Sequence, residues 1–349
     1  MKSVIIFMWI ALIFGVLTFS KRESSSKKEE KTIDVFAWSE AFFPETIEAF
    51  TNETGINVRM HYYTSNEELL TKLRACKGKG YDLIIPSDYT VKILIDEEML
   101  KPLDKSQLEF ASHLNPVLLG RDYDPDNTYS LPYEWEIFGF GIDVDAFDSP
   151  PTSWKELFSP SMEETKIAMT NDPIEAVNFA AYHLFGEDPT ISDEGVYRIS
   201  HLLKTQKKWV ESYAGLRADY LLATKNCQIA LSTGSFIFRS LDHSPHVKFV
   251  LPDDYTFISI ENVCIPKYSE KEALTYLFLN KVYAPKAISK YCSTFYTFPA
   301  TTNCYPLIEA PPYYMEILQD PEFHKRRLYF IRHLISEKEA RTLWINVKS

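Results

Sequence analysis

The sequence lacks the short motifs by which most catalytic and cofactor sites are recognised. "KGKG" at 77–80 does not have the Walker A spacing, and "GFG" at 139–141 is only a fragment of a dinucleotide-binding loop. "STGSF" at 232–236 is not the G-x-S-x-G of a serine hydrolase. His243 and His246 lack a third ligand at metal-binding spacing. The sequence therefore predicts no catalytic residue, no metal site and no cofactor, and a protein that is not an enzyme.

Cysteine is scarce, and acidic residues outnumber basic ones. The five cysteines are scattered without a C-x-x-C pair, which argues against zinc and favours buried thiols. A Cys292–Cys304 bridge stays open as an alternative in an oxidising compartment. The 37 Lys and Arg face 48 Asp and Glu, which gives a net charge of −11. Such an acidic chain is a poor partner for nucleic acid and a plausible one for cations.

The amino terminus carries no charge between residues 4 and 19. This apolar run, with the small residues Thr18 and Ser20 at its end, predicts a signal peptide over 1–20 and therefore export. An uncleaved membrane anchor is the alternative. No cysteine follows the run directly, so a lipoprotein is not favoured. Residues 21–31, "KRESSSKKEEK", are expected to form a charged, flexible linker.

From residue 32 onward, strand-like and helix-like segments alternate. Apolar or alternating runs at 32–38, 56–63 and 81–86 predict strands, and helix-start and helix-stop signals lie between them. Such alternation implies right-handed crossovers and a mostly parallel sheet. A chain of 349 residues exceeds one ordinary core, so we expect an α/β protein with two lobes. Further helices are expected at 174–185 and 194–213.

Polar side chains follow the first and third of these predicted strands. "WSE" closes the first strand, and "PSDY" closes the third. Ligands of open α/β sheets bind beyond the carboxyl ends of the strands. Trp38, Ser39, Ser87 and Tyr89 are therefore candidate binding residues. Trp38 as a core residue and Ser87 as a simple strand end are the alternative interpretations.

Six blocks of sequence stand out in order: VFAWSEAFFPETIEAFTNETGINV (35–58), SNEELLTKL (65–73), GYDLIIPSDYTV (80–91), EEMLKPLDKSQL (97–108), YDPDNTYSLPYEW (123–135) and SWKELFSP (153–160). Together they resemble bacterial spermidine/putrescine-binding proteins, the extracytoplasmic receptors of polyamine ABC transporters. The resemblance is dense through about residue 160 and looser afterwards. It implies the two-lobed periplasmic-binding-protein fold, with a mostly parallel, helix-flanked sheet in each lobe and the ligand in a cleft that closes by a hinge.

The resemblance also implies how the chain is divided and what lines the cleft. We expect 32–137 and 260–306 to form the first lobe, and 138–259 and 307–349 to form the second. In the family, aromatic side chains sandwich the methylene chain and carboxylates bind the ammonium groups. Both roles are physically sound, because methylenes favour flat apolar walls and a desolvated ammonium needs acceptors for its three donors.

Carried over residue by residue, the resemblance predicts eight ligand-binding positions. Asp172 and Glu175, in "NDPIEAV", match the block where an Asp and a Glu bind an amine. Asp172 also suits the N-cap of a helix that starts at Pro173, which is a purely structural alternative. Glu261 stands where the family has Asp, and Tyr296 precedes a Pro-containing loop. The full set is Trp38, Ser39, Ser87, Tyr89, Asp172, Glu175, Glu261 and Tyr296.

Three positions depart from the family pattern. Ala41 replaces a Tyr, and Ser232 and Ser259 fall where the family has cleft tryptophans. We therefore expect positive charge to be selected, while the grip on a bare methylene chain is weakened. Additional acids are expected near the cleft at Asp88, Glu134 and Glu136.

The leading hypothesis from the sequence is a periplasmic solute-binding protein. It would capture a polyamine as a monomer, without nucleic acid, and deliver it to the permease subunits of an ABC transporter in the inner membrane. A receptor for another organic cation or a small polar metabolite is the alternative, because of the missing aromatics. A secreted enzyme on the same scaffold, or a structural or adhesive surface protein, is a further alternative from a different class.

Overall fold

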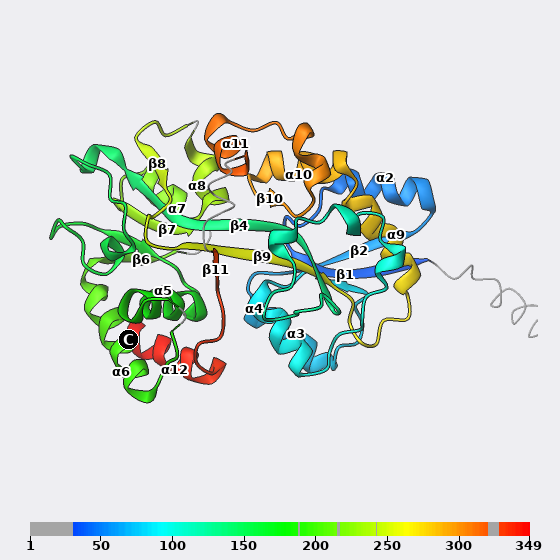
Figure 1. The fold of residues 1–349 in the computed structure, drawn as a ribbon, viewed down its shortest axis with the longest axis horizontal. Coiled ribbons are helices and arrows are strands. Elements are labelled where there is room, and N and C mark those ends of the chain that lie inside the picture. Colours follow the sequence, from blue (N-terminus) through cyan, green and yellow to red (C-terminus); the bar gives the residue numbers. More distant parts are fainter. Residues whose placement is uncertain (1–30, 188, 215–216, 242, 320–327) are drawn as a thin grey trace, which may run out of the picture.

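The computed structural model describes residues 31–187, 189–214, 217–241, 243–319 and 328–349. The predicted signal peptide, and the predicted linker apart from its last residue, lie outside the described residues. The ribbon shows two lobes joined by long strands that run from one to the other (Figure 1). The strands form one sheet in the order β2-β1-β3-β9-β4-β7-β5-β6, with β8 and β10 paired to β4 and β11 paired to β9.

The first lobe is built from the alternating segments near the amino terminus. β1 pairs in parallel with both β2 and β3, as predicted. Pro44 lies in the first turn of α2, Gly55 ends that helix with a φ of 68°, and the Ser65 hydroxyl caps α3. The elements of this lobe are β1 (Thr32–Trp38), α2 (Pro44–Thr54), β2 (Asn57–Tyr63), α3 (Asn66–Cys76), β3 (Leu83–Ile84), α4 (Asp88–Asp96) and α9 (Glu272–Val282).

The third strand is shorter than the predicted strand at 81–86. Only Leu83 and Ile84 belong to it. Pro86 has no N–H to donate, and Ser87 forms an isolated antiparallel bridge to Glu261. The chain thus leaves the ladder early and begins α4 directly after Ser87.

Two long antiparallel strands, β4 (Ser130–Asp143) and β9 (Thr256–Cys264), connect the lobes. Their register places Glu134 opposite Glu261 and Glu136 opposite Ser259. Opposite residues, and residues two apart on one strand, share a face of the sheet, so the three glutamates lie on one face. The sheet as a whole is mixed, because β4 pairs antiparallel with β7, β8, β9 and β10. The small partners at the crossing are β10 (Phe298–Pro299) and β11 (Leu328–Phe330).

The second lobe contains the strands paired beyond β4. β5 pairs in parallel with β6 and β7. The helix expected over 194–213 is wrong beyond Gln206, because Val210 and Tyr213 leave it to pair with β5. The elements are β5 (Ile167–Met169), α5 (Pro173–Phe185), α6 (Asp193–Gln206), β6 (Val210–Tyr213), α7 (Ala218–Ala223), β7 (Ile229–Thr233), α8 (Gly234–Leu241), β8 (Val247–Val250) and α12 (Glu337–Lys348).

The chain also has two α-helices near the crossing strands and several 3-10 turns. Figure 1 shows α10 and α11 above the crossing strands, next to β10. The remaining helices are α10 (Pro285–Phe295), α11 (Pro312–Gln319) and 3-10 turns at Lys105–Gln107, Ala111–His113, Pro116–Leu118, Val144–Ala146, Trp154–Leu157, Lys207–Trp209 and Thr302–Leu307.

Each lobe has its own buried apolar cluster. Val35 and Phe278 are fully buried in the first, and Phe140 and Leu157 are fully buried in the second. All five cysteines are free thiols, and all but Cys76 are buried. Among the described residues, no helix is both long and apolar enough to cross a membrane.

Candidate ligand-binding site

Glu261 is held by side chains that follow the first and third strands. The Trp38 indole nitrogen Nε1 donates to Glu261 Oε2 at 2.8 Å, and Ser87 Oγ donates to Oε1 at 2.5 Å. These bonds favour the carboxylate, but burial outweighs them and raises the pKa of Glu261 to about 8. The structure therefore brings three predicted site residues together around one carboxyl group.

Asp172 and Glu175 stand at the start of α5. Asp172 Oδ1 accepts from the backbone nitrogens of Ile174 (2.7 Å) and Glu175 (3.1 Å), so it is the helix N-cap. The Thr170 hydroxyl donates to Glu175 Oε2. Burial raises the pKa of both carboxyl groups, and the charge of Asp172 helps to raise that of Glu175 to about 8. Asp172 therefore has the N-cap role that was considered as the structural alternative. Its other carboxylate oxygen, Oδ2, does not take part in the cap.

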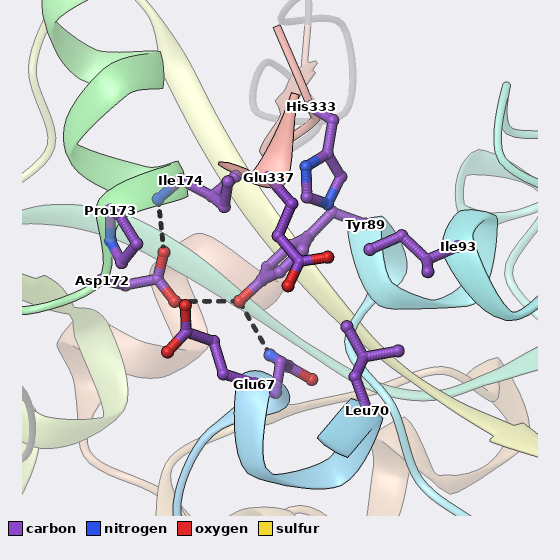
Figure 2. A pocket seen from close by; sticks show the side chains of 10 residues that line it. Glu67, Leu70, Tyr89, Ile93, Asp172, Pro173, Ile174, His333 and Glu337 are labelled. Carbon is purple, nitrogen blue, oxygen red and sulfur yellow. Dashed lines mark hydrogen bonds between the residues drawn. The ribbon is translucent and has the colours of Figure 1, made fainter. Parts of the chain in front are cut away.

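Tyr89 connects this pair to the first lobe (Figure 2). Its hydroxyl donates to Asp172 Oδ2 at 3.1 Å and accepts from Asn66 Nδ2 at 2.8 Å. The same Asn66 nitrogen lies 3.0 Å from Ser87 Oγ. A continuous chain of hydrogen bonds therefore runs from Asp172 in the second lobe to Glu261 in the first. Asn66 was not predicted from the sequence, where it reads only as the first residue of a helix.

Two more glutamates lie on β4, on the same face as Glu261. Glu134 Oε1 accepts from the Tyr291 hydroxyl at 2.9 Å, and its Oε2 has no hydrogen-bond partner among the described residues. Burial, followed by the charge of Glu136, raises the pKa of Glu134 to about 8. Burial also raises the pKa of Glu136, although the hydroxyls of Ser235 and Thr233 bond to it.

The carboxyl groups of Glu134, Glu136, Asp172, Glu175 and Glu261 form what we call the acidic cluster. Glu136 carries charge close enough to raise the pKa of Glu134, Glu175 and Glu261. Among the residues that the structure describes, no Lys or Arg forms an ion pair with a member of the cluster. Arg239 is the basic residue whose charge lowers the pKa of Glu136.

Asp88, the first residue of α4, is fully buried. Its Oδ1 accepts from the Tyr89 backbone nitrogen at 2.8 Å, and Oδ2 has no partner among the described residues. Burial raises its pKa to about 8. Its charge in turn helps to raise the pKa of Glu175 and Glu261, so Asp88 lies close to the cluster without being a member of it.

Two predicted residues are set apart from these hydrogen bonds. Ser39 is exposed directly after β1. Tyr296 ends α10 in the left-handed conformation (φ 58°), and its ring centroid lies 6.3 Å from those of Phe238 and Tyr314. Whether either residue contacts a ligand stays a prediction.

The positions that depart from the family pattern differ in their surroundings. Ala41 and Ser232 are buried. Ser259 is half-buried, directly opposite Glu136. It therefore shares a face of the sheet with the three glutamates of β4 and β9.

Ion pairs also cross between the lobes outside the acidic cluster. Arg341 of α12 lies 3.3 Å from Glu67 of α3, and Arg74 of α3 lies 3.2 Å from Glu337 of α12. We call these four residues the α3–α12 bridge. A small pocket beside it is lined by side chains of both lobes, including Tyr89 and Asp172 (Figure 2). The lobes are therefore in contact in this structure.

Two lobes joined by crossing strands, with an acidic cluster at their junction, define the class of two-lobed solute-binding proteins. The model of the bacterial extracellular solute-binding protein family matches residues 45–322. The chain belongs to this family, as the sequence blocks predicted.

Curated relatives and solved structures share this similarity. A spermidine/putrescine-binding periplasmic protein of Salmonella typhimurium is 27% identical over 272 residues, 76% of each chain. A putrescine-binding periplasmic protein of Escherichia coli is 26% identical over 301 residues, 81% of each chain. The structure of a spermidine/putrescine ABC transporter substrate-binding protein from Streptococcus pneumoniae matches with a TM-score of 0.77, at 22% identity over 91% of this chain and 98% of that one. This structure confirms the predicted two-lobed fold.

Proposed function

We propose that this protein captures a polyamine between its lobes and delivers it to an ABC permease in the inner membrane. The observation that carries the proposal is the acidic cluster. Its five carboxyl groups are crowded, largely enclosed and without an ion-pair partner among the described residues. Crowded acids of this kind are costly unless cations reach them, and a polyamine carries several cations on one chain.

The geometry offers acceptors on both sides of the junction. Asp172 and Glu175 come from the second lobe, and Glu261 comes from the strand pair at the centre. The half-buried ring of Trp38 bonds to Glu261 and the ring of Tyr89 bonds to Asp172, so each of these two acceptors has an aromatic ring next to it. Ammonium groups joined by methylenes match this combination of carboxyl groups and aromatic rings.

The eight predicted residues belong to the proposed ligand site, and the predicted lobe boundaries are proposed with it. The names of the relatives support a polyamine as ligand and an ABC transporter as destination. They also support a periplasmic location and a role in binding without catalysis. We propose a monomer, because ligand capture between two lobes of one chain needs no second copy.

Calorimetry on the purified protein tests the proposal directly. Putrescine, spermidine, a monoamine and a neutral polar metabolite are titrated separately at pH 8. We expect saturable binding of the two polyamines, much weaker binding of the monoamine and no turnover of any compound. Binding of the neutral metabolite with no response to polyamines would overturn the proposal.

Small-angle scattering tests where a bound polyamine lies. Trp38 and Tyr89 come from one lobe, and Asp172 and Glu175 from the other. The radius of gyration should fall when a ligand bridges them. No change, for a polyamine shown by calorimetry to bind, would argue against a site between moving lobes.

A further inference from the structure

Arg239 of α8 reaches from the second lobe to the first. Its Nη2 lies 3.3 Å from Glu40 Oε2, in the segment that follows Trp38 and Ser39. The arginine side chain is 31% exposed and that of Glu40 is 55% exposed. The guanidinium is thus placed at the junction of the lobes, less accessible than its partner.

Aromatic rings hold this guanidinium. Its central carbon lies 5.1 Å from the ring centroid of Phe236 and 5.3 Å from that of Phe295. Its Nε is buried and has no hydrogen-bond partner among the described residues. The charge of Arg239 is therefore only partly compensated by Glu40.

The nearest end of the acidic cluster is the one around Glu136. α8 follows β7 directly, and the hydroxyls of Thr233 and Ser235, at that turn, bond to Glu136. Ser259 lies opposite Glu136 on β9. This end of the cluster therefore combines hydroxyl groups with a nearby internal cation.

The other carboxyl groups of the cluster are surrounded differently. Asp172 and Glu175 are bonded by backbone nitrogens and hydroxyls, and Glu261 by Trp38 and Ser87. Glu134 accepts from a tyrosine, and a hydrogen bond with the Thr297 side chain also lowers its pKa. No basic side chain of the described residues stands among the groups that shift their pKa. These four carboxyl groups therefore have no basic side chain of the described residues among the groups that shift their pKa, whereas Glu136 has Arg239.

We propose that Arg239 is a specificity-determining residue, which acts as a built-in cation at the Glu136 end and thereby favours diamines over triamines. A diamine places its two ammonium groups at the Asp172–Glu175 pair and at the Glu134–Glu261 pair. A third ammonium would have to lie near Glu136, where it meets the like charge of Arg239. This inference rests on the proposed function. It goes further by specifying how many ammonium groups of a ligand the site accepts.

The test compares the affinities of spermidine and putrescine for wild type and Arg239→Gln by calorimetry at pH 8. We expect the ratio of spermidine affinity to putrescine affinity to rise about tenfold in Arg239→Gln, since a like-charge contact is removed. Arg239→Lys keeps the charge and should keep the ratio close to wild type. It also shows whether the position tolerates substitution if Arg239→Gln fails to fold.

Two controls separate selectivity from other effects. Glu40→Gln breaks the contact between the lobes but leaves the arginine charge, so the ratio should not rise. Lys290→Gln removes an exposed positive charge that stacks on Phe43, a ring that itself stacks on Phe295, and it should leave the ratio unchanged.

The outcomes are distinct. An unchanged ratio in Arg239→Gln, or weaker binding of both amines, overturns the role of Arg239 while polyamine binding itself stands. If wild type binds neither amine, the proposed function fails, and this inference fails with it.

Discussion

The two lobes hold their carboxyl groups in different ways. In the second lobe, Asp172 is bonded by backbone nitrogens at the start of a helix, where the helix dipole also favours negative charge. At the central strands, Glu261 relies on two side chains, and Glu134 has one oxygen without a partner among the described residues. Asp172 is therefore positioned by the protein itself, whereas Glu134 and Glu261 have more to gain from a cation that a ligand brings.

The pH dependence of binding gives the largest expected effect. Burial raises the pKa of Glu134, Glu175 and Glu261 to about 8, from an ordinary value of 4.5. An ammonium favours the ionised carboxylates, so binding releases protons below pH 8. Polyamine affinity should fall as the pH drops from 8 to 6, by about tenfold per pH unit for each proton released. Calorimetry in buffers of different ionisation enthalpy counts these protons.

The same carboxyl groups make the stability of the unliganded protein fall as the pH rises, whereas polyamine affinity rises with pH. Between pH 4.5 and 8 the folded state holds protons that the unfolded chain has already released. The free energy of unfolding should therefore fall as the pH rises through this window, and bound polyamine should restore it. Thermal unfolding at pH 5 and pH 8 measures this. A melting temperature that rises with pH without ligand would contradict the raised pKa values.

Removal of one charge at the helix start comes next. Asp172→Asn keeps an N-cap side chain but loses a charge-assisted bond to the ligand, so binding should weaken by about 1.5–3 kcal/mol. Stability should change little, because Asn is as good an N-cap as Asp. Asp193→Asn, in the first turn of α6, is the matched control and should leave binding unchanged. An unaltered dissociation constant in folded Asp172→Asn would remove Asp172 from the site.

Restoring an aromatic side chain at the site should tighten polyamine binding, by less than Asp172→Asn weakens it. Ser259→Trp places a ring beside Glu136, and covering about 50 Å² of methylene surface would tighten spermidine binding by about 1 kcal/mol. Ser232→Trp is the contrast. Ser232 is buried and pairs with Gly139, where even a Cβ would lie 2.5 Å from Phe249, so this change should destabilise the protein. Nanomolar spermidine binding by wild type would show that other aromatics already supply the wall.

The smallest effect is expected at the α3–α12 bridge. Arg341→Gln removes an exposed contact to Glu67, and exposed ion pairs contribute less than about 1 kcal/mol. Polyamine affinity should fall by a few-fold at low salt, and the difference should vanish at high salt. Lys338→Gln, an exposed lysine on the same helix, controls for net charge. A loss that persists at high salt would mean that Arg341 acts by another route.

The parts of the fold that depend on local sequence were predictable. Pro44, Gly55 and Ser65 set the helix ends of the first lobe through their own backbone chemistry. Trp38 and Ser87 could be expected to lie close together because the ends of neighbouring strands meet, and both bond to Glu261. The short β3 and the early end of the 194–213 helix were missed, because pairing with distant strands decided them.

The contacts between lobes could not be predicted from the sequence. Tyr89 meets Asp172 across 83 positions, and Arg239 meets Glu40 across nearly 200, with no local pattern that marks either pair. The register that sets Glu134 against Glu261 depends on how two long strands cross. The residue types of a charged site are visible in a sequence, but the position of Arg239 beside Glu40 of the other lobe appears only when the lobes are assembled.

The uneven burial of the five cysteines makes the protein suitable for labelling with a fluorophore at a single position. Cys76 is half-buried, and the other four thiols are buried in the folded chain. Cys76 lies on α3, two positions from Arg74, whose side chain contacts Glu337 of the opposite lobe. A thiol-reactive fluorophore should therefore label one native position, and that position adjoins a contact that exists only when the lobes meet. The unmodified sequence thus carries its own attachment point for following closure by fluorescence.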